Sequence, residues 1–166
     1  MTSKVPFVKQ ETNWLALIPK LAVIGILCLC FYPLDKQNFF LLAFVVYLIL
    51  TYIARHLFYP VVMHDGIRLI KEGKFEEAIP FIQKTIDYYT KKAWVDKFRF
   101  ILLISSSKRT IRESSICNLA YCYLQTGQIQ KSKEIYNDVL RQYPENINAK
   151  IMLNTIDLVS EDKAPC

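Results

Sequence analysis

Two long apolar runs before residue 60 constrain the fold of this chain more than any other feature. The first covers residues 14–32, with Lys20 near its start, and the second covers residues 38–58. Each reaches the roughly 18–20 residues that an α-helix needs to cross about 30 Å of hydrocarbon. A short polar turn at residues 33–37 separates them. The pattern therefore predicts a hairpin of two membrane-spanning helices.

Two other structures can produce the same runs. A pair of buried core helices is disfavoured, because so small a chain cannot surround two helices that are apolar on all sides. A cleaved signal peptide is disfavoured, because no small-x-small cleavage site follows the first run and the second begins almost at once. Aromatic residues near the predicted span ends are typical of a membrane-interface belt. They are Trp14, Phe31, Tyr32, Phe39, Tyr52, Phe58 and Tyr59.

The basic residues around the hairpin predict its orientation. They lie before or near the start of the first span and near the end of or after the second, whereas the turn carries Lys36 beside Asp35. The flanking set is Lys4, Lys9, Lys20, Arg55, Arg68, Lys71 and Lys74. Since basic loops stay on the cytoplasmic side, both termini are expected in the cytoplasm and the turn outside. Five cysteines without zinc-site spacing are consistent with reduced, structural thiols.

After residue 60 the apolar residues recur at helical intervals, most regularly in residues 113–146. The first stripe is Ile116, Leu119, Ala120, Tyr123 and Leu124, and the second is Ile129, Ile135, Tyr136, Val139 and Leu140. Gly127 lies between the stripes and Pro144 follows them, so we expect a glycine-closed turn and a proline stop. Small residues at Ala120 and Ser132 allow the two helices to approach closely.

This spacing resembles the tetratricopeptide (TPR) repeat, a 34-residue pair of helices. The matching positions are Leu119, Ala120, Tyr123, Gly127, Tyr136 and Pro144. A divergent first unit at residues 59–92 contains Gly73-Lys74-Phe75-Glu76-Glu77-Ala78, but Pro80 is expected to bend its second helix and Thr90 replaces the final proline. The resemblance covers roughly residues 59–159 and implies a helical array that binds proteins.

The predicted fold is all-α: a two-span hairpin followed by a short TPR-like α-solenoid with a C-terminal cap helix. The predicted parts are a tail at 1–13, the spans within 14–59, the helical domain at 60–160 and a tail at 161–166. Within the domain, an insert at 93–112 separates the two units and a helix at 147–159 closes the array. Because stable arrays usually need three repeats, the hairpin, the cap or self-association must supply further burial.

The insert contributes an unusual concentration of positive charge. Between residues 84 and 112 the chain has eight lysines and arginines and two aspartates, a net charge equal to the +6 of the whole chain. Three interpretations stay open: a long solvated second helix of the first repeat, contact with anionic lipid headgroups, or an acidic partner. The candidate surface residues are Lys91, Lys92, Trp94, Lys97, Phe98, Arg99, Lys108 and Arg109.

The inner helices of the TPR-like units supply the candidate partner-binding residues. These are Arg68, Lys71, Asn118, Tyr121, Cys122 and Gln125. Some TPR domains hold a C-terminal carboxylate with lysine, asparagine and arginine. Asn118 occupies the matching asparagine position, but Met152 stands where the cap helix would need a basic residue. The resemblance therefore implies an incomplete carboxylate clamp.

The sequence contains no pattern typical of catalysis. It has no nucleophile paired with a base, no metal-ligand spacing and no glycine-rich phosphate loop, and its two histidines, His56 and His64, lack an acid placed to complete a metal site. We expect no enzyme activity, cofactor, metal or nucleic-acid binding. The first hypothesis is a membrane-anchored module that recruits protein or peptide partners and touches lipid. The alternative is a non-catalytic structural subunit of a larger membrane complex, and self-association is left open.

Overall fold

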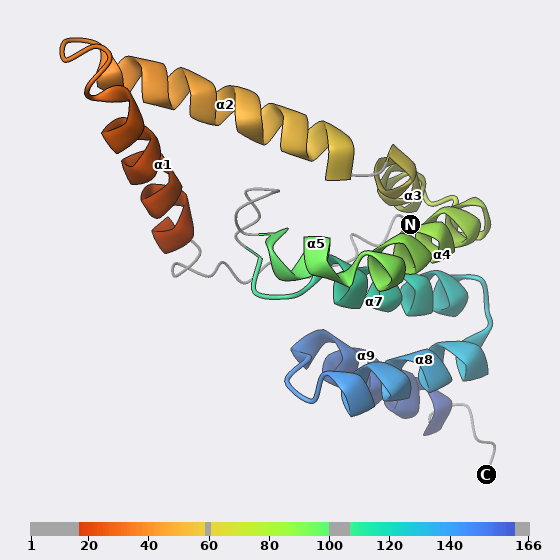
Figure 1. Cartoon of the computed structure of the whole chain (residues 1–166). Coiled ribbons are helices and arrows are strands. Elements are labelled where there is room, and N and C mark those ends of the chain that lie inside the picture. The colour runs from red at the N-terminus through yellow and green to blue at the C-terminus, as the bar shows by residue number, and fades with distance from the viewer. Residues whose placement is uncertain (1–16, 59–60, 100–106, 162–166) are drawn as a thin grey trace. The chain divides into compact units, whose positions relative to one another are not determined.

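The computed structural model describes residues 17–58, 61–99 and 107–161, and these residues form helices without strands (Figure 1). The helices are α1 (Leu17–Phe31), α2 (Phe39–Phe58), α3 (Val61–Lys71), α4 (Phe75–Lys91), α5 (Ala93–Lys97), α7 (Ile111–Gln125), α8 (Ile129–Gln142) and α9 (Ile147–Glu161). The all-α prediction is confirmed. The N-terminal tail, residues 14–16 of the first expected span, residues 100–106 of the insert and residues 162–166 lie outside the described residues.

The chain divides into two compact units. The described part of one consists of residues 61–91 and 109–161, and that of the other consists of residues 17–58, 92–99 and 107–108. We call them the repeat unit and the hairpin unit. The insert is thereby split, because its residues 93–99 and 107–108 belong with the apolar helices and its residues 109–112 belong with the repeats.

In the repeat unit each helix packs on the next one along the chain. The packed pairs are α3 with α4, α4 with α7, α7 with α8, and α8 with α9. Figure 1 shows α4 beside α7, although residues 92–108 intervene in the sequence. The two helix pairs predicted from the sequence are therefore direct neighbours, although the insert separates them in the sequence.

The loops inside the two helix pairs have the same backbone conformation. Gly73 and Gly127 have φ values of 77° and 79°, the left-handed region that glycine enters without strain. In the first loop the Lys74 amide donates to the Leu69 carbonyl at 2.9 Å, and in the second the Gln128 amide donates to Tyr123 at 2.8 Å. Both loops are thus closed by the same glycine C-cap, which satisfies carbonyls at the helix end.

Helix α7 lies at the centre of the repeat unit because both of its faces are buried. One face joins a core with α3 and α4, made of Leu69, Ala78, Ile82, Leu119, Cys122 and Tyr123. The other joins a core with α8 and α9, made of Cys117, Ala120, Tyr136, Val139, Ala149 and Ile156. Apolar residues of α7 therefore face two cores, although the helix also carries polar residues such as Arg112 and Asn118.

Two expectations about the first repeat need adjustment. Helix α4 continues through Pro80, whose side chain is exposed. The missing amide leaves the Glu76 carbonyl without its helical donor, but Glu76 is also exposed and water can replace that bond. The interpretation of the insert as an extension of this helix is wrong, because α4 ends at Lys91 and a turn at Lys92 precedes α5.

In the hairpin unit, α1 and α2 pack on each other. The turn that joins them is closed by Asp35. Its carboxylate accepts from the Gln37 amide at 2.9 Å and from the Asn38 amide at 3.2 Å and side chain at 3.0 Å. These bonds, with the Asn38 side chain contributing most, lower the pKa of Asp35. The turn thereby supplies acceptors for donors at the N-terminus of α2.

Among the described helices, α2 is long and apolar enough to cross a membrane, with 20 residues. A core helix of a soluble protein would be mostly buried, whereas only Ala43 and Thr51 of α2 are. Helix α1 is apolar but has 15 residues, short of a full span. The structure therefore supports one candidate span, and the two-span hairpin stays a prediction.

Candidate protein-binding surface and basic insert

The α7–α8 pair is held by contacts that depend on small side chains. Ala120 and Ser132 are completely buried where the helices meet. The Ser132 hydroxyl donates to the Ala120 carbonyl at 2.8 Å, and the Tyr136 hydroxyl donates to the Cys117 carbonyl at 3.4 Å. The prediction that small residues allow close approach here is confirmed, and serine adds a hydrogen bond between the helices.

A buried polar network connects the start of α7 with the start of α9. The Asn146 side-chain amide donates to Glu113 Oε1 at 2.8 Å and to Cys117 Sγ at 3.4 Å. Its side-chain oxygen accepts from the Ala149 amide at 2.9 Å, as a helix N-cap does. Thr110 caps α7 by accepting from the Glu113 amide at 3.0 Å. Asn146 therefore fixes the position of α9 against α7.

Arg112, near the start of α7, connects the C-terminal ends of α4 and α8. Its guanidinium donates to the Thr90 hydroxyl of α4 at 3.0 Å, and to Gln142 at 3.3 Å and the Tyr143 hydroxyl at 3.0 Å beyond α8. Thr90 occupies the place where a TPR unit usually has proline. This threonine accepts a bond that proline could not, which ties the divergent first unit to the second.

Burial makes the two thiols of α7 inert. Desolvation raises the pKa of Cys117 to about 11, despite the opposing hydrogen bond from Asn146. Desolvation also raises the pKa of Cys122 to about 12. Because the thiolate is the nucleophile, neither side chain is reactive near neutral pH. Cys122 is completely buried in the core with α3 and α4, so this predicted partner-binding residue is not available to a partner.

The other partner-binding candidates lie at or near the surface of the repeat unit. Gln125 is exposed, and Asn118 and Tyr121 are half-buried on α7. Tyr121 packs edge-on against Phe75 of α4 with 5.6 Å between ring centroids. Lys71 and Arg68 are exposed on α3. All the candidates come from the first helices of the two pairs, and among them Cys122 is the one that is completely buried.

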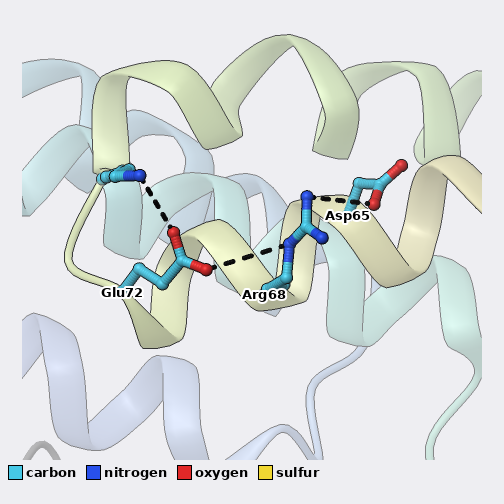
Figure 2. A network of polar contacts seen from close by, with 4 residues as sticks. Asp65, Arg68 and Glu72 are labelled. Atoms are coloured by element: carbon cyan, nitrogen blue, oxygen red, sulfur yellow. Dashed lines mark ion pairs between the residues drawn. The ribbon is translucent and has the colours of Figure 1, made fainter.

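Arg68 lies between two acidic side chains (Figure 2). Its guanidinium is 3.5 Å from Asp65 and 3.8 Å from Glu72, and the Lys74 ammonium is 3.1 Å from the other Glu72 oxygen. The hydrogen bond that the Lys74 ammonium donates to Glu72 is the main cause of the raised pKa of Lys74. These pairs are exposed and contribute little to stability. They do orient Arg68 along α3.

A shallow depression of about 340 Å³ connects the two loops of the repeat unit. Its wall is made by residues 73–77 on one side and by Gln125 and Thr126 on the other. The sequence predicts Gln125 as a partner-binding residue but does not indicate this depression. Matching positions in the sequence show that the two helix pairs are similar. They do not show the space between the two loops, because that space depends on how α4 packs on α7.

In the hairpin unit the insert is shaped by Arg99, which is buried. Its guanidinium donates to three carbonyls: Asp96 at 2.9 Å, Ser107 at 3.2 Å and Lys108 at 3.1 Å. These bonds join the two described ends of the insert. Arg99 was predicted as part of a charged surface, and that prediction is wrong because only 5% of the residue is exposed.

The remaining candidate surface residues of the insert are accessible. Lys92, Trp94, Lys97, Phe98 and Lys108 are exposed in the hairpin unit. Lys91 is exposed and Arg109 is half-buried in the repeat unit. The predicted patch therefore divides between the two units, and four of its exposed members lie in or directly beside α5: Lys92, Trp94, Lys97 and Phe98.

The comparison with known proteins agrees with the geometry of the second helix pair. Residues 118–146 match the sequence profile of the Tetratricopeptide repeat family. The match begins within α7 and ends at Asn146, the residue that caps α9. No curated protein and no solved structure matches the chain. The chain thus contains one TPR motif, and this class of motif indicates interaction with other proteins.

Proposed function

We propose that this protein is a non-catalytic interaction module that is anchored in a membrane and recruits or assembles protein partners at the cytoplasmic face. The observation that carries the proposal is the α7–α8 pair, which combines the TPR sequence match with TPR-like packing. TPR helices bind peptides or helices of other proteins in grooves between their first helices. Here those helices are α3 and α7.

The anchoring half of the proposal rests on the apolar helices of the hairpin unit. The 20 residues of α2 give a length of about 30 Å, which matches the hydrocarbon thickness. Its large apolar side chains are mostly exposed, so they require a lipid or protein environment. The exposed set includes Phe40, Leu41, Leu48, Ile49, Tyr52 and Leu57. Anchoring would raise the local concentration of the repeat unit for membrane-associated partners.

The proposed partner surface consists of Arg68 and Lys71 on α3 and Asn118, Tyr121 and Gln125 on α7. It is polar, its charged members are Arg68 and Lys71, and Arg68 is paired with Asp65 and Glu72. The neighbouring depression adds Glu76 and Glu77 at its wall. This mixture of charges fits a short peptide or helix with polar and charged side chains better than an apolar groove ligand.

Photo-crosslinking in native membranes tests the partner surface. A photo-reactive amino acid is placed at Gln125 or Asn118 of the full-length protein, and at exposed Asn137 on α8 as a control. We expect defined protein adducts from the α7 positions and none from the control, with mass spectrometry naming the partner. Equal adducts from all three positions, or none from α7, would count against a specific surface on these helices.

A second candidate is the structural subunit of a larger membrane complex, which one observation on α9 favours. Ile147, Ile151 and Leu158 are exposed along one side of this helix. A cap helix normally presents a polar outer face, so this apolar stripe is unusual for a free array end. A stable monomer in detergent would support the interaction module, whereas obligate co-purification with other membrane proteins would support the subunit.

A further inference from the structure

Two aromatic side chains are exposed at helix α5: Trp94 lies within the helix and Phe98 directly follows it. Trp94 is 49% exposed and Phe98, four residues later, is 51% exposed. The neighbouring Val95 and Asp96 are buried and fix the opposite side of the helix. The short helix is therefore held in an orientation that leaves the large apolar side chains of Trp94 and Phe98 at the surface.

The surroundings of these aromatic residues are basic. Lys92 and Lys97 are exposed next to them, and Lys108 is exposed at the other end of the insert. Asp96 is the only acidic residue between positions 92 and 108, and it is buried. An exposed surface that combines tryptophan and phenylalanine with lysines is typical of proteins that enter the headgroup region of anionic membranes.

The same unit places this surface at the end of the candidate span. Phe58 is the last residue of α2, and its ring packs edge-on against Trp94 with 5.2 Å between centroids. A helix that crosses the hydrocarbon ends at the lipid headgroups, which is the depth where tryptophan is enriched. Trp94 therefore lies at interface depth if α2 spans the membrane.

We propose that α5 binds the anionic phospholipid headgroups beside α2, with Trp94 and Phe98 inserted at the interface and Lys92 and Lys97 on the phosphates. Arg99 is not part of this surface, because it holds the ends of the insert together from within. The proposal rests on the membrane anchoring proposed above. Its role is to fix the segment that joins the anchor to the repeats against the bilayer.

Tryptophan quenching in the full-length protein tests the proposal. Trp14 and Trp94 are the two tryptophans, so the variant Trp14→Phe makes Trp94 the reporter. The protein is reconstituted into nanodiscs of neutral phosphatidylcholine or of phosphatidylcholine with phosphatidylglycerol, each with lipids brominated near the headgroup. We expect strong quenching of Trp94 in anionic discs and weaker quenching in neutral ones. Equal quenching in both, or none, would overturn the anionic-headgroup proposal.

Charge variants provide the matched control. The double variant Lys92→Gln/Lys97→Gln should weaken headgroup binding in anionic discs about tenfold or more, because each lysine near an anionic surface contributes on the order of a several-fold preference. The double variant Lys84→Gln/Lys150→Gln removes the same charge from exposed positions of the repeat unit and should leave quenching unchanged. Equal losses in both would show a nonspecific charge effect and overturn the proposal.

Failure of this proposal is distinguishable from failure of the anchor. If alkaline carbonate extracts the protein from membranes, both the anchoring and the headgroup surface are wrong. If the protein resists extraction but Trp94 is unquenched, the headgroup proposal alone is wrong. Unquenched Trp94 together with photo-adducts from position 98 to a protein would assign the surface to a protein partner instead.

Discussion

At the scale of single residues, Asn146 determines how the second helix pair is closed. It is almost completely buried and joins the Glu113 carboxylate, the Cys117 thiol and the N-terminus of α9. In the sequence it marks only the end of the TPR-like unit. Its role could not be predicted, because three partners far apart in the chain define it.

Replacing Asn146 by alanine should destabilise the repeat unit by about 1–3 kcal/mol, because the helix cap and a buried donor are lost together. Unfolding of the full-length protein in detergent, followed by circular dichroism, measures the change. Asn137→Ala on the exposed side of α8 is the control and should lie within about 0.5 kcal/mol of the parent. Similar values for both variants would contradict a structural role for the Asn146 network.

The buried thiols predict a pH dependence on the alkaline side. The folded state raises the pKa of Cys117 from 9.0 to about 11, so between these values the unfolded chain loses a proton that the folded chain keeps. Raising the pH therefore favours unfolding, and the free energy of unfolding should fall by about 2–3 kcal/mol across this window. Thermal melts at pH 8 to 11 measure it. Cys117→Ala should show a shallower slope, and an unchanged slope would contradict the assignment.

Arg99 shows where a charge count is misleading. Arginine is rarely buried, so a basic run predicts a solvated or ligand-binding surface. The structure instead uses Arg99 and Arg112 as multiple donors that connect segments. The surface charge of the insert is accordingly smaller than its sequence indicates.

We predict that Arg99→Met loosens the insert without unfolding the repeat unit. The variant keeps the apolar stem but removes three hydrogen bonds to carbonyls. Amide hydrogen exchange of the full-length protein should increase at residues 96–99 and 107–108 and stay constant in α7 and α8. Lys97→Met, an exposed neighbour, is the control. Unchanged exchange in Arg99→Met would contradict the proposed role.

At the scale of helices and loops, the repeat pattern was the most predictable part of the structure. Gly73 and Gly127 follow the first helix of each pair, because the turn there requires the left-handed conformation that glycine adopts without strain. Periodic apolar residues predicted α7, α8 and α9. The sequence could not show that α4 packs directly on α7, since the intervening insert hides that the two pairs are neighbours. Nor could it show that Cys122 faces the core on a helix buried on both sides.

At the buried Gly66, helix α3 lies close to α4. A Cβ atom there would lie 3.3 Å from both Ile82 Cγ1 and Phe81 Cβ. Gly66→Leu should therefore force the helices apart and destabilise the protein by about 1–3 kcal/mol. His64→Leu, at an exposed position of the same helix, is the control and should change stability little. Denaturant unfolding in detergent compares them, and equal stability would contradict close packing at Gly66.

At the scale of the whole molecule, two units of different character are interleaved in one chain, because residues 92–99 and 107–108 of the hairpin unit lie between the two parts of the repeat unit. The repeat unit has its own cores and polar caps, whereas the hairpin unit exposes most of its apolar side chains. That contrast is the physical basis of the proposed anchor. Composition alone predicted it, and the described part of the first expected span is helical over the 15 residues of α1.

Cysteine accessibility in intact cells tests the anchored hairpin most directly. Cys28 and Cys30 are replaced by alanine, the buried Cys117 and Cys122 are kept, and a membrane-impermeant reagent probes Ser3→Cys, Lys36→Cys and Cys166 in separate variants. The account predicts labelling at position 36 from outside, and labelling at positions 3 and 166 only after permeabilisation. Outside labelling at both 3 and 36 would mean that α2 alone spans the membrane, and outside labelling of Cys166 would contradict a cytoplasmic repeat unit.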